Sequence, residues 1–220
     1  MTSREHIPIF AAPELDRDQE NRTALFQVCE AARRAKTQEQ LLRRILETVR
    51  TGFGWVYASY FSVVRHQGLE PVLCFAFDSG EVRKAFRQAT AAARFTRGED
   101  LAGLAWQRRD LVFVEDVTRA GDFLRAGAAL ASGLRSGFWV PVTSGTQVIG
   151  TVELFCPERL RPGKGRMAAL RAIQGILATA LRGMRGSERL LHAGAPARIA
   201  GHAGSLNPDS GSTHAGASPA

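Results

Sequence analysis

The sequence lacks an uninterrupted apolar run of the ~20 residues that a membrane-spanning helix needs, because Arg or Lys interrupts every hydrophobic segment within a few turns. Its first residues also lack the basic start and apolar run of a secretory signal. These two absences predict a soluble, cytoplasmic protein that does not bind membranes.

Lysine is scarce, and the positive charge has another source. Lysine occurs only as Lys36, Lys84 and Lys164, so the formal net charge of +8 comes almost wholly from arginine. A basic surface can attract nucleic acid. Here, however, the arginines are spread along the expected helices instead of gathering in one run, which is typical of solvated helix faces. We therefore do not expect nucleic acid to be a partner.

Cysteine and histidine are too scattered to suggest a metal site. Cys29, Cys74 and Cys156 are odd in number and far apart, each inside an apolar pattern, which favours free, buried thiols in a reducing compartment. His192, His202 and the other histidines are equally dispersed, so local spacing builds neither a metal site nor a Cys-His dyad. The sequence predicts no metal and no cofactor.

The two ends of the chain differ in composition and patterning from the part between them. Residues 1–20 mix proline and charge without any period, which predicts a flexible lead-in. Residues 185–220 are rich in Gly, Ala, Ser and Pro and offer too little apolar surface to offset the entropy of ordering, so a disordered tail is expected. The intervening residues 21–184 are long enough to bury a core as one domain.

Within this domain, helical and strand periodicities alternate. Thr37 is placed as the N-cap of a helix whose stripe includes Leu41 and Val49. Strands paired as hairpins, with helices at both ends, predict an α+β fold: a central antiparallel sheet of five to six strands with helices on both faces. The strands are expected at 55–64, 69–77, 111–114, 137–143 and 147–155. Further helical segments are expected around 25–32, at 80–93, 98–109 and 123–131, and beyond Pro162.

Two neighbouring segments resemble a known family. The sequences GEDLAGLAWQRRDLVFVEDVTRAGDF (98–123) and GLRSGFWVPVTSGTQVIGTVELFCPE (133–158) resemble GAF domains of bacterial multi-sensor signalling proteins. Those domains carry a Gly-Leu helix, a short apolar strand that closes on Asp-Val, and then two strands with similar motifs. The resemblance rests on the order and spacing of these pieces and extends over residues 22–184.

The resemblance implies a sensory domain with a ligand pocket on one face of the sheet. The first and last helices would pack on the other face, where such helices commonly build a dimer bundle. It thus implies an unknown small-molecule ligand, a homodimer formed through the terminal helices, and a signalling partner such as a histidine kinase. Carried over by position, the ligand-pocket candidates are Trp106, Phe113, Asp116, Phe123, Arg135 and Trp139.

Each candidate also has a purely structural interpretation. Asp116 can end a strand while Asp122 caps the following helix. Arg135 can hold an anionic ligand with its planar guanidinium or can form a salt bridge within the protein. The large aromatic side chains can line a cavity or fill the core.

The special chemistries of the family have no counterpart here. The NK…F…DE signature of cyclic-nucleotide-binding members is missing, as are the Cys that tethers a bilin, the His that ligates haem, and the three-Cys arrangement of the methionine sulfoxide reductase branch. A GxSxG motif and a Walker-type phosphate loop are also absent. A redox enzyme would require Cys74 or Cys156 to be exposed with a lowered pKa. We therefore expect no catalytic residues and no enzyme.

Two functions follow from these expectations. The first is a stand-alone GAF-type sensory domain that binds a small molecule or a partner protein in signal transduction, with the signal leaving through contact with another protein. The alternative is a degenerate GAF domain that serves as a dimerisation adaptor without ligand. In that case Trp106 and Trp139 would fill the former pocket.

Overall fold

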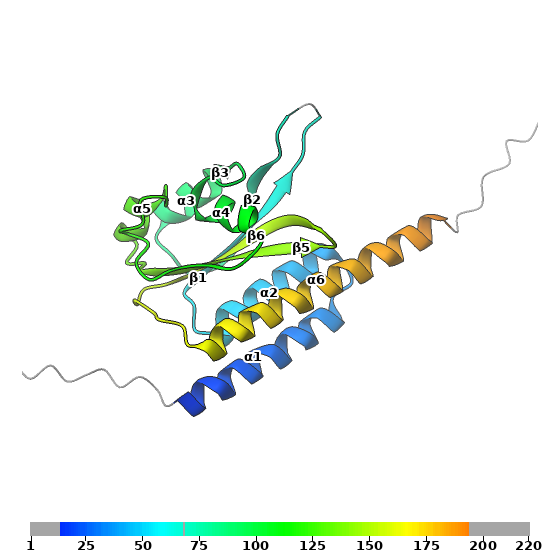
Figure 1. Cartoon of the computed structure of the whole chain (residues 1–220), viewed down its shortest axis with the longest axis horizontal. Helices are drawn as coiled ribbons and strands as arrows, with labels where there is room; N and C mark the ends of the chain where they lie inside the picture. The colour runs from blue at the N-terminus through cyan, green and yellow to red at the C-terminus, as the bar shows by residue number, and fades with distance from the viewer. Residues whose placement is uncertain (1–13, 68, 194–220) are drawn as a thin grey trace, which may run out of the picture.

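The computed structural model describes residues 14–67 and 69–193, with side chains described for 18–67 and 69–184. Its strands are β1 (Tyr57–Val64), β2 (Val72–Gly80), β3 (Arg94–Phe95), β4 (Val112–Val114), β5 (Ser136–Ser144) and β6 (Gln147–Cys156). They join into a six-stranded sheet in the order β3-β2-β1-β6-β5-β4, and every neighbouring pair is antiparallel (Figure 1). The predicted antiparallel sheet is confirmed.

Helices cover both faces of this sheet, as the sequence predicts for an α+β fold (Figure 1). One face carries α2 (Gln38–Gly52) and α6 (Lys164–Ala193), and α1 (Glu14–Arg34) packs against these two helices on the side away from the sheet. The opposite face carries the shorter α3 (Lys84–Ala92), α4 (Asp100–Arg108) and α5 (Ala126–Ala131). The sheet therefore separates a bundle of long helices from a roof of short ones.

The start and the buried side of α2 follow directly from its sequence. Thr37 adopts extended backbone dihedrals, and its side-chain oxygen accepts a hydrogen bond from the Gln40 amide at 3.2 Å. Leu41, Ile45 and Val49 recur at helical spacing and are all buried. The capped, amphipathic helix thus lies with its apolar side on the sheet.

Alternation along the strands divides the interior into two apolar cores. On β1, Ala58 and Tyr60 belong to the core beneath the long helices, whereas Tyr57 and Phe61 belong to the core beneath the roof. Successive side chains of a strand point to opposite faces. The pairing of β1 with β2 is irregular between Tyr60 and Phe61, where β2 carries one extra residue, Ala76. This bulge changes the phase of β2, so Phe75 and Phe77 face opposite cores.

The two terminal helices extend beyond the segment 21–184 that the sequence predicts as the domain. Helix α1 begins at Glu14, inside the predicted lead-in, and α6 continues past Met184 to Ala193. Helix α1 is ordered because it buries Ala24 and Val28 in the long-helix layer. The remainder of the predicted lead-in and tail, 1–13 and 194–220, lies outside the described residues.

Cys29 is exposed, so the prediction that all three cysteines are buried is wrong for this residue. The adjacent Val28 takes the buried side of α1, which turns Cys29 to the surface. Cys74 is half-buried and Cys156 is buried. Burial raises the pKa of the Cys156 thiol.

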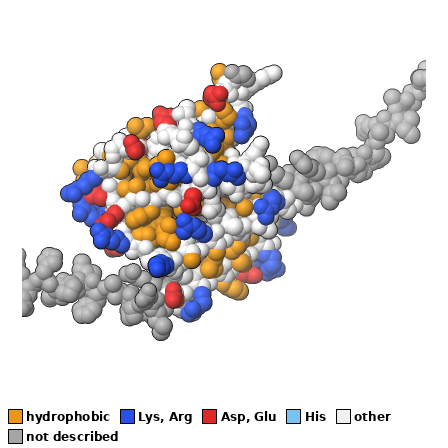
Figure 2. Space-filling view, viewed as in Figure 1, with side chains coloured by type: hydrophobic (Ala, Val, Ile, Leu, Met, Phe, Trp, Pro, Cys, Tyr) orange, Lys and Arg blue, Asp and Glu red, His pale blue; other side chains and the backbone are white. Residues whose placement is uncertain are grey.

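The described surface shows no concentration of one charge on the face in view. Basic side chains are scattered there among acidic and apolar ones (Figure 2). Among the described residues, no helix is both long and apolar enough to cross a bilayer. Within 14–67 and 69–193, no group of three or more His, Cys, Asp and Glu side chains is placed to hold a metal ion.

Candidate functional site

A fully buried carboxylate, Glu153, lies near the middle of the sheet on the face beneath the short helices. Its cross-strand neighbours are Ser59 on β1 and Trp139 on β5. The Ser59 hydroxyl donates to Oε2 at 2.8 Å, and the Trp139 indole Nε1 donates to Oε1 at 2.8 Å. A buried carboxylate needs a cation as well as hydrogen bonds to offset its lost hydration.

Arg125, the residue immediately before α5, supplies that cation. Its Nη1 donates to Glu153 Oε2 at 3.0 Å and its Nη2 to Oε1 at 2.5 Å, so the pair is bidentate. Nη1 also donates to Thr90 Oγ1 at 3.1 Å. Arg125 is 5% exposed and Glu153 is 0% exposed, so solvent screens this ion pair very little.

Four phenylalanine rings surround the Arg125 guanidinium. Its Cζ lies 5.0 to 5.7 Å from the ring centroids, within the range of a cation–π interaction. The Nε atom of Arg125 is buried and has no hydrogen-bond partner among the described residues. The guanidinium is therefore caged by aromatic faces and only partly satisfied by polar partners. The rings are those of Phe61, Phe86, Phe95 and Phe123.

Asp100 places a second carboxylate beside Arg125. Its Oδ1 lies 3.8 Å from Arg125 Nη2, and it accepts hydrogen bonds from the amides of Ala102 at 3.2 Å and Leu124 at 2.9 Å. Burial raises the pKa of Asp100 to about 6, against the lowering effect of the Arg125 charge. Its backbone φ of 56° lies in the left-handed region, which non-glycine residues rarely adopt. A shifted carboxyl and a strained backbone thus coincide at one residue.

These groups come from six helices and strands and from the segment before α5, and they form one connected unit. We call it the Arg125 cluster. Buried polar networks of this kind hold their members in fixed positions when they are satisfied. The Arg125 cluster consists of Ser59, Phe61, Phe86, Thr90, Phe95, Asp100, Phe123, Arg125, Trp139 and Glu153.

Three of the six candidates from the sequence lie on this face. Trp106, Phe123 and Trp139 are 8%, 2% and 0% exposed and belong to the core beneath the roof. The rings of Phe123 and Trp139 meet edge to face at 5.7 Å between centroids. The structure brings these three candidates into one core, while their contact with a ligand stays a prediction.

The other three candidates lie elsewhere. Phe113 packs against Phe138 at 4.6 Å between ring centroids, in the core beneath the long helices. Asp116 forms an ion pair with Arg159 at 2.6 Å, and Arg135 donates to the Thr118 hydroxyl at 3.3 Å.

The separation of these candidates follows from strand geometry and local bonding. On β4, Val112 faces the roof, so its neighbour Phe113 faces the opposite side. The Asp116 carboxylate accepts hydrogen bonds from the amide and hydroxyl of Thr118, which lower its pKa. These contacts engage Asp116 at the edge of the sheet, away from the Arg125 cluster.

Sequence reasoning missed Asp100, Arg125 and Glu153. A signal for Glu153 was available, because it is the charged residue of a strand, 147–156, that is otherwise apolar or neutral. A charge in a strand buried on both faces requires an internal partner. Which arginine would meet it was not readable from the sequence.

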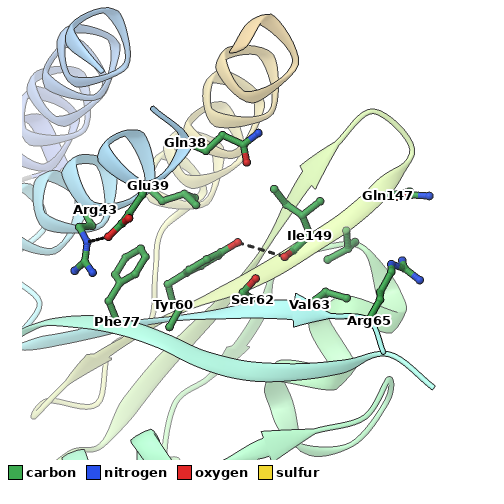
Figure 3. Close-up of a pocket in the computed structure, with 13 residues that line it drawn as sticks. Gln38, Glu39, Arg43, Tyr60, Ser62, Val63, Arg65, Phe77, Gln147 and Ile149 are labelled. Atoms are coloured by element: carbon green, nitrogen blue, oxygen red, sulfur yellow. Dashed lines mark hydrogen bonds and ion pairs between the residues drawn. The ribbon is translucent and has the colours of Figure 1, made fainter. Parts of the chain in front are cut away.

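An open hollow lies on the other face, between the start of α2 and strands β1, β2 and β6 (Figure 3). Its volume is about 600 Å³. Arg43 forms an ion pair with Glu39 at 2.8 Å and lies 4.3 Å above the Phe77 ring, and the Tyr60 hydroxyl donates to the Ile149 carbonyl at 3.3 Å. None of the six sequence candidates lines it. We call this hollow the α2 groove.

Solved structures share the fold of this chain. A free methionine-R-sulfoxide reductase from Neisseria meningitidis in complex with its substrate is 20% identical, with a TM-score of 0.64 over 83% of this chain and 99% of its own. The GAF domain of a phosphoenolpyruvate-protein phosphotransferase from Coxiella burnetii is 15% identical, with a TM-score of 0.64 over 78% and 98%. The fRMsr protein of Staphylococcus aureus in its reduced form is 16% identical, with a TM-score of 0.55 over 73% and 94%.

The reductases correct one expectation from the sequence. The absence of familiar catalytic motifs predicted that the chain is not an enzyme, but proteins of the same fold include reductases. The GxSxG motif and the Walker-type loop belong to other catalytic folds, so their absence does not exclude an enzyme on this one. The prediction that the chain is not an enzyme is therefore wrong.

The sequence itself shows the family. No curated protein matches it. The family model described as "GAF domain" matches residues 35–182, which is more than half of the chain and includes the whole sheet and the Arg125 cluster. The chain therefore belongs to the GAF domain family, a family of signalling and sensory domains.

Proposed function

We propose that this GAF domain is a sensory module that binds a small molecule on the sheet face beneath α3, α4 and α5, with Glu153 as its polar anchor. The observation that supports this proposal is the bonding of Glu153. A carboxylate with 0% exposure receives hydrogen bonds from Ser59, Trp139 and Arg125 at the centre of an aromatic core. Small-molecule sites are typically apolar with a few convergent polar groups of this kind.

The energetic cost of burying Arg125 and Glu153 supports a functional role for the Arg125 cluster. Replacing a buried ion pair by well-packed apolar residues is often neutral or stabilising, so stability alone does not require Arg125 and Glu153. Shifted carboxyl pKa values and strained backbone also concentrate at functional sites. Asp100 has both of these features and lies beside the pair.

The roof over this face is suited to opening. Helix α5 spans only Ala126–Ala131, and the flanking Leu124 and the helical Leu130 are 66% and 53% exposed. A short segment with few buried apolar groups opens locally at a lower free energy than the core strands. A ligand could therefore reach Glu153 without unfolding the sheet.

Equilibrium dialysis against a defined pool of metabolites, read by mass spectrometry, tests this proposal. Three proteins are compared: the full chain, Glu153→Gln, and Ser62→Ala in the α2 groove. We expect the full chain and Ser62→Ala to retain the same ligand, and Glu153→Gln to lose it. Retention by Glu153→Gln and loss by Ser62→Ala would move the site to the α2 groove and refute the proposal, as would the absence of any retained ligand.

A second candidate is a dimerisation adaptor, and the filling of the roof core favours it. Trp106, Phe123 and Trp139 are at most 8% exposed, as expected if they occupy a former pocket. In this case the terminal helices α1 and α6 would form a homodimer and contact a signalling protein such as a histidine kinase. Phe26 on α1, which is 69% exposed, is available for such a contact.

Sedimentation equilibrium of the full chain and of Phe26→Asp tests the adaptor. The adaptor predicts a dimer that Phe26→Asp converts to a monomer, together with no ligand in the dialysis experiment. A full chain that stays monomeric over the accessible concentration range would exclude it. Arg22→Asp, an exposed substitution on the same helix, controls for the added charge.

A further inference from the structure

We propose that the Arg125 cluster is a binding site for a guanidinium-type cation, which the chain fills with its own Arg125 until a ligand carrying that group displaces it. This inference rests on the proposed function and names its ligand class. It follows from what surrounds Arg125 and from how Arg125 is attached to the domain.

The surroundings of Arg125 match a planar cation. Without this side chain, the Glu153 carboxylate would face the space left behind, with Asp100 and the Thr90 hydroxyl at its border. Carboxylates take guanidinium groups in a bidentate manner, and aromatic faces attract cations. A neutral or anionic occupant would leave the Glu153 charge buried and uncompensated, which is strongly unfavourable. The site therefore selects for positive charge and for a planar pair of donors.

The attachment of Arg125 allows it to leave. It precedes a helix of six residues, and its side chain makes no capping hydrogen bond to that helix. Its buried Nε also has no hydrogen-bond partner among the described residues. A Cβ added at Gly121 or Gly127 would meet no described atom within 4 Å, so open space flanks the segment. A ligand whose N–H donors all find hydrogen-bond partners in the site could therefore replace the Arg125 side chain.

Displacement would carry information to the surface. The Leu124 amide donates to Asp100 Oδ2 at 2.9 Å, immediately before Arg125. If Arg125 leaves, this bond and the Phe123 ring lose their support, because both belong to the same short segment. Residues 118–134 would then change exposure at the protein surface, where a partner could sense the change.

The test uses Arg125→Ala in the full chain and two small probes of matched shape. N-ethylguanidinium restores the atoms that the substitution removes, and N-ethylurea has the same shape without the charge. Calorimetric titration should show that Arg125→Ala binds ethylguanidinium about 10- to 100-fold more tightly than ethylurea, the difference expected for hydrogen bonds to a charged group. Arg135→Ala, which removes a half-buried arginine outside the cluster, should show no such preference.

A double variant and a measurement on the unmodified chain complete the test. Adding Glu153→Gln to Arg125→Ala should abolish the preference for the cation. In the unmodified chain, ethylguanidinium should accelerate amide hydrogen exchange at Leu124, and ethylurea at equal concentration should not. This measurement does not depend on the folding of any variant.

The outcomes separate this inference from the proposed function. Equal binding of the two probes by folded Arg125→Ala, or unchanged exchange at Leu124 in the unmodified chain, would overturn the cation site. A neutral or anionic ligand retained through Glu153 in the dialysis experiment would also overturn it while supporting the proposed function. Cation preference in Arg125→Ala with no ligand retained by the unmodified chain would support the chemistry of the site and refute the sensory role.

Discussion

Arg125 and Glu153 form a bidentate ion pair inside an aromatic core, at 3.0 and 2.5 Å between their nitrogen and oxygen atoms. The residues lie 28 positions apart in the sequence, one ahead of the short helix α5 and the other on a central strand. The pair thus fastens the roof of the domain to its sheet. The contribution of this ion pair to stability and its role in ligand binding can be tested separately.

The first prediction concerns the loss of one partner. Glu153→Gln should lower the free energy of unfolding by about 3–5 kcal/mol, because the buried Arg125 charge loses its bidentate partner and keeps only Asp100, 3.8 Å away. Glu39→Gln, which breaks the exposed pair with Arg43, should cost less than about 1 kcal/mol. Urea unfolding followed by circular dichroism measures both. Equal losses of unfolding free energy in the two variants would show that burial does not determine how much an ion pair contributes to stability.

The second prediction concerns the loss of both partners. The double variant Arg125→Met, Glu153→Leu should be more stable than Glu153→Gln, because neither member of the bidentate pair is left without the other and Asp100, beside them, can take up a proton. It should nevertheless fail to retain the ligand of the unmodified chain. Urea unfolding and the dialysis experiment provide the two readouts. A double variant that still binds the ligand would separate the cluster from function.

The third prediction concerns pH. Folding raises the pKa of Asp100 from 3.8 to about 6, so the folded state binds this proton more tightly than the unfolded state. The contribution of Asp100 to stability is therefore complete below pH 3.8 and is lost as the pH rises through about 6. At 1.36 kcal/mol for each unit of pKa difference, the loss amounts to about 3 kcal/mol.

Comparison with Asp100→Asn isolates this effect from the other carboxyl groups. Hydrogen bonds lower the pKa values of Glu47 and Glu99, so their contributions change with pH in the opposite direction. These contributions cancel in the difference between the two proteins. Urea unfolding at several pH values should show that the unmodified chain loses stability relative to Asp100→Asn between pH 4 and about 6. A difference that rises with pH would contradict the assignment.

The fourth prediction compares two glycines inside helices. A Cβ added at Gly103 on α4 would collide with the Thr96 carbonyl and crowd the Gly98 amide, both of which are backbone groups. Gly103→Ala should therefore lower the free energy of unfolding by about 1–3 kcal/mol. Gly175 on α6 has open space, so Gly175→Ala should be neutral or stabilising by up to about 1 kcal/mol. Thermal unfolding compares them directly, and a destabilising Gly175→Ala would contradict the packing described for α6.

Much of the fold was predictable because its signals are local. Thr37 identifies the start of α2 through a bond to an amide three residues away, and Gly145, with a φ of 63°, provides the reversal between β5 and β6. Apolar periodicity located the long helices and the five longer strands. Strand β3 was missed because two residues, Arg94 and Phe95, are too few to show a period.

The site was less predictable because its partners are distant in the sequence. Ser59 and Glu153 are 94 residues apart and meet only because β1 pairs with β6. Nothing in the local sequence of either strand specifies that order. Trp139 was identified through the family resemblance, but its hydrogen bond to Glu153 depends on the alignment of β5 with β6.

The position of Glu153 between Ser59 and Trp139 also has a consequence for folding. Sliding β6 by one residue against its neighbours would turn this carboxylate toward the apolar layer beneath the long helices, away from Ser59, Trp139 and Arg125. The misaligned sheet would carry an isolated charge in hydrocarbon surroundings, at a penalty far larger than ordinary mismatched packing. Glu153, which holds the short helices to the sheet, thereby also disfavours misaligned pairing of β6 while the sheet assembles.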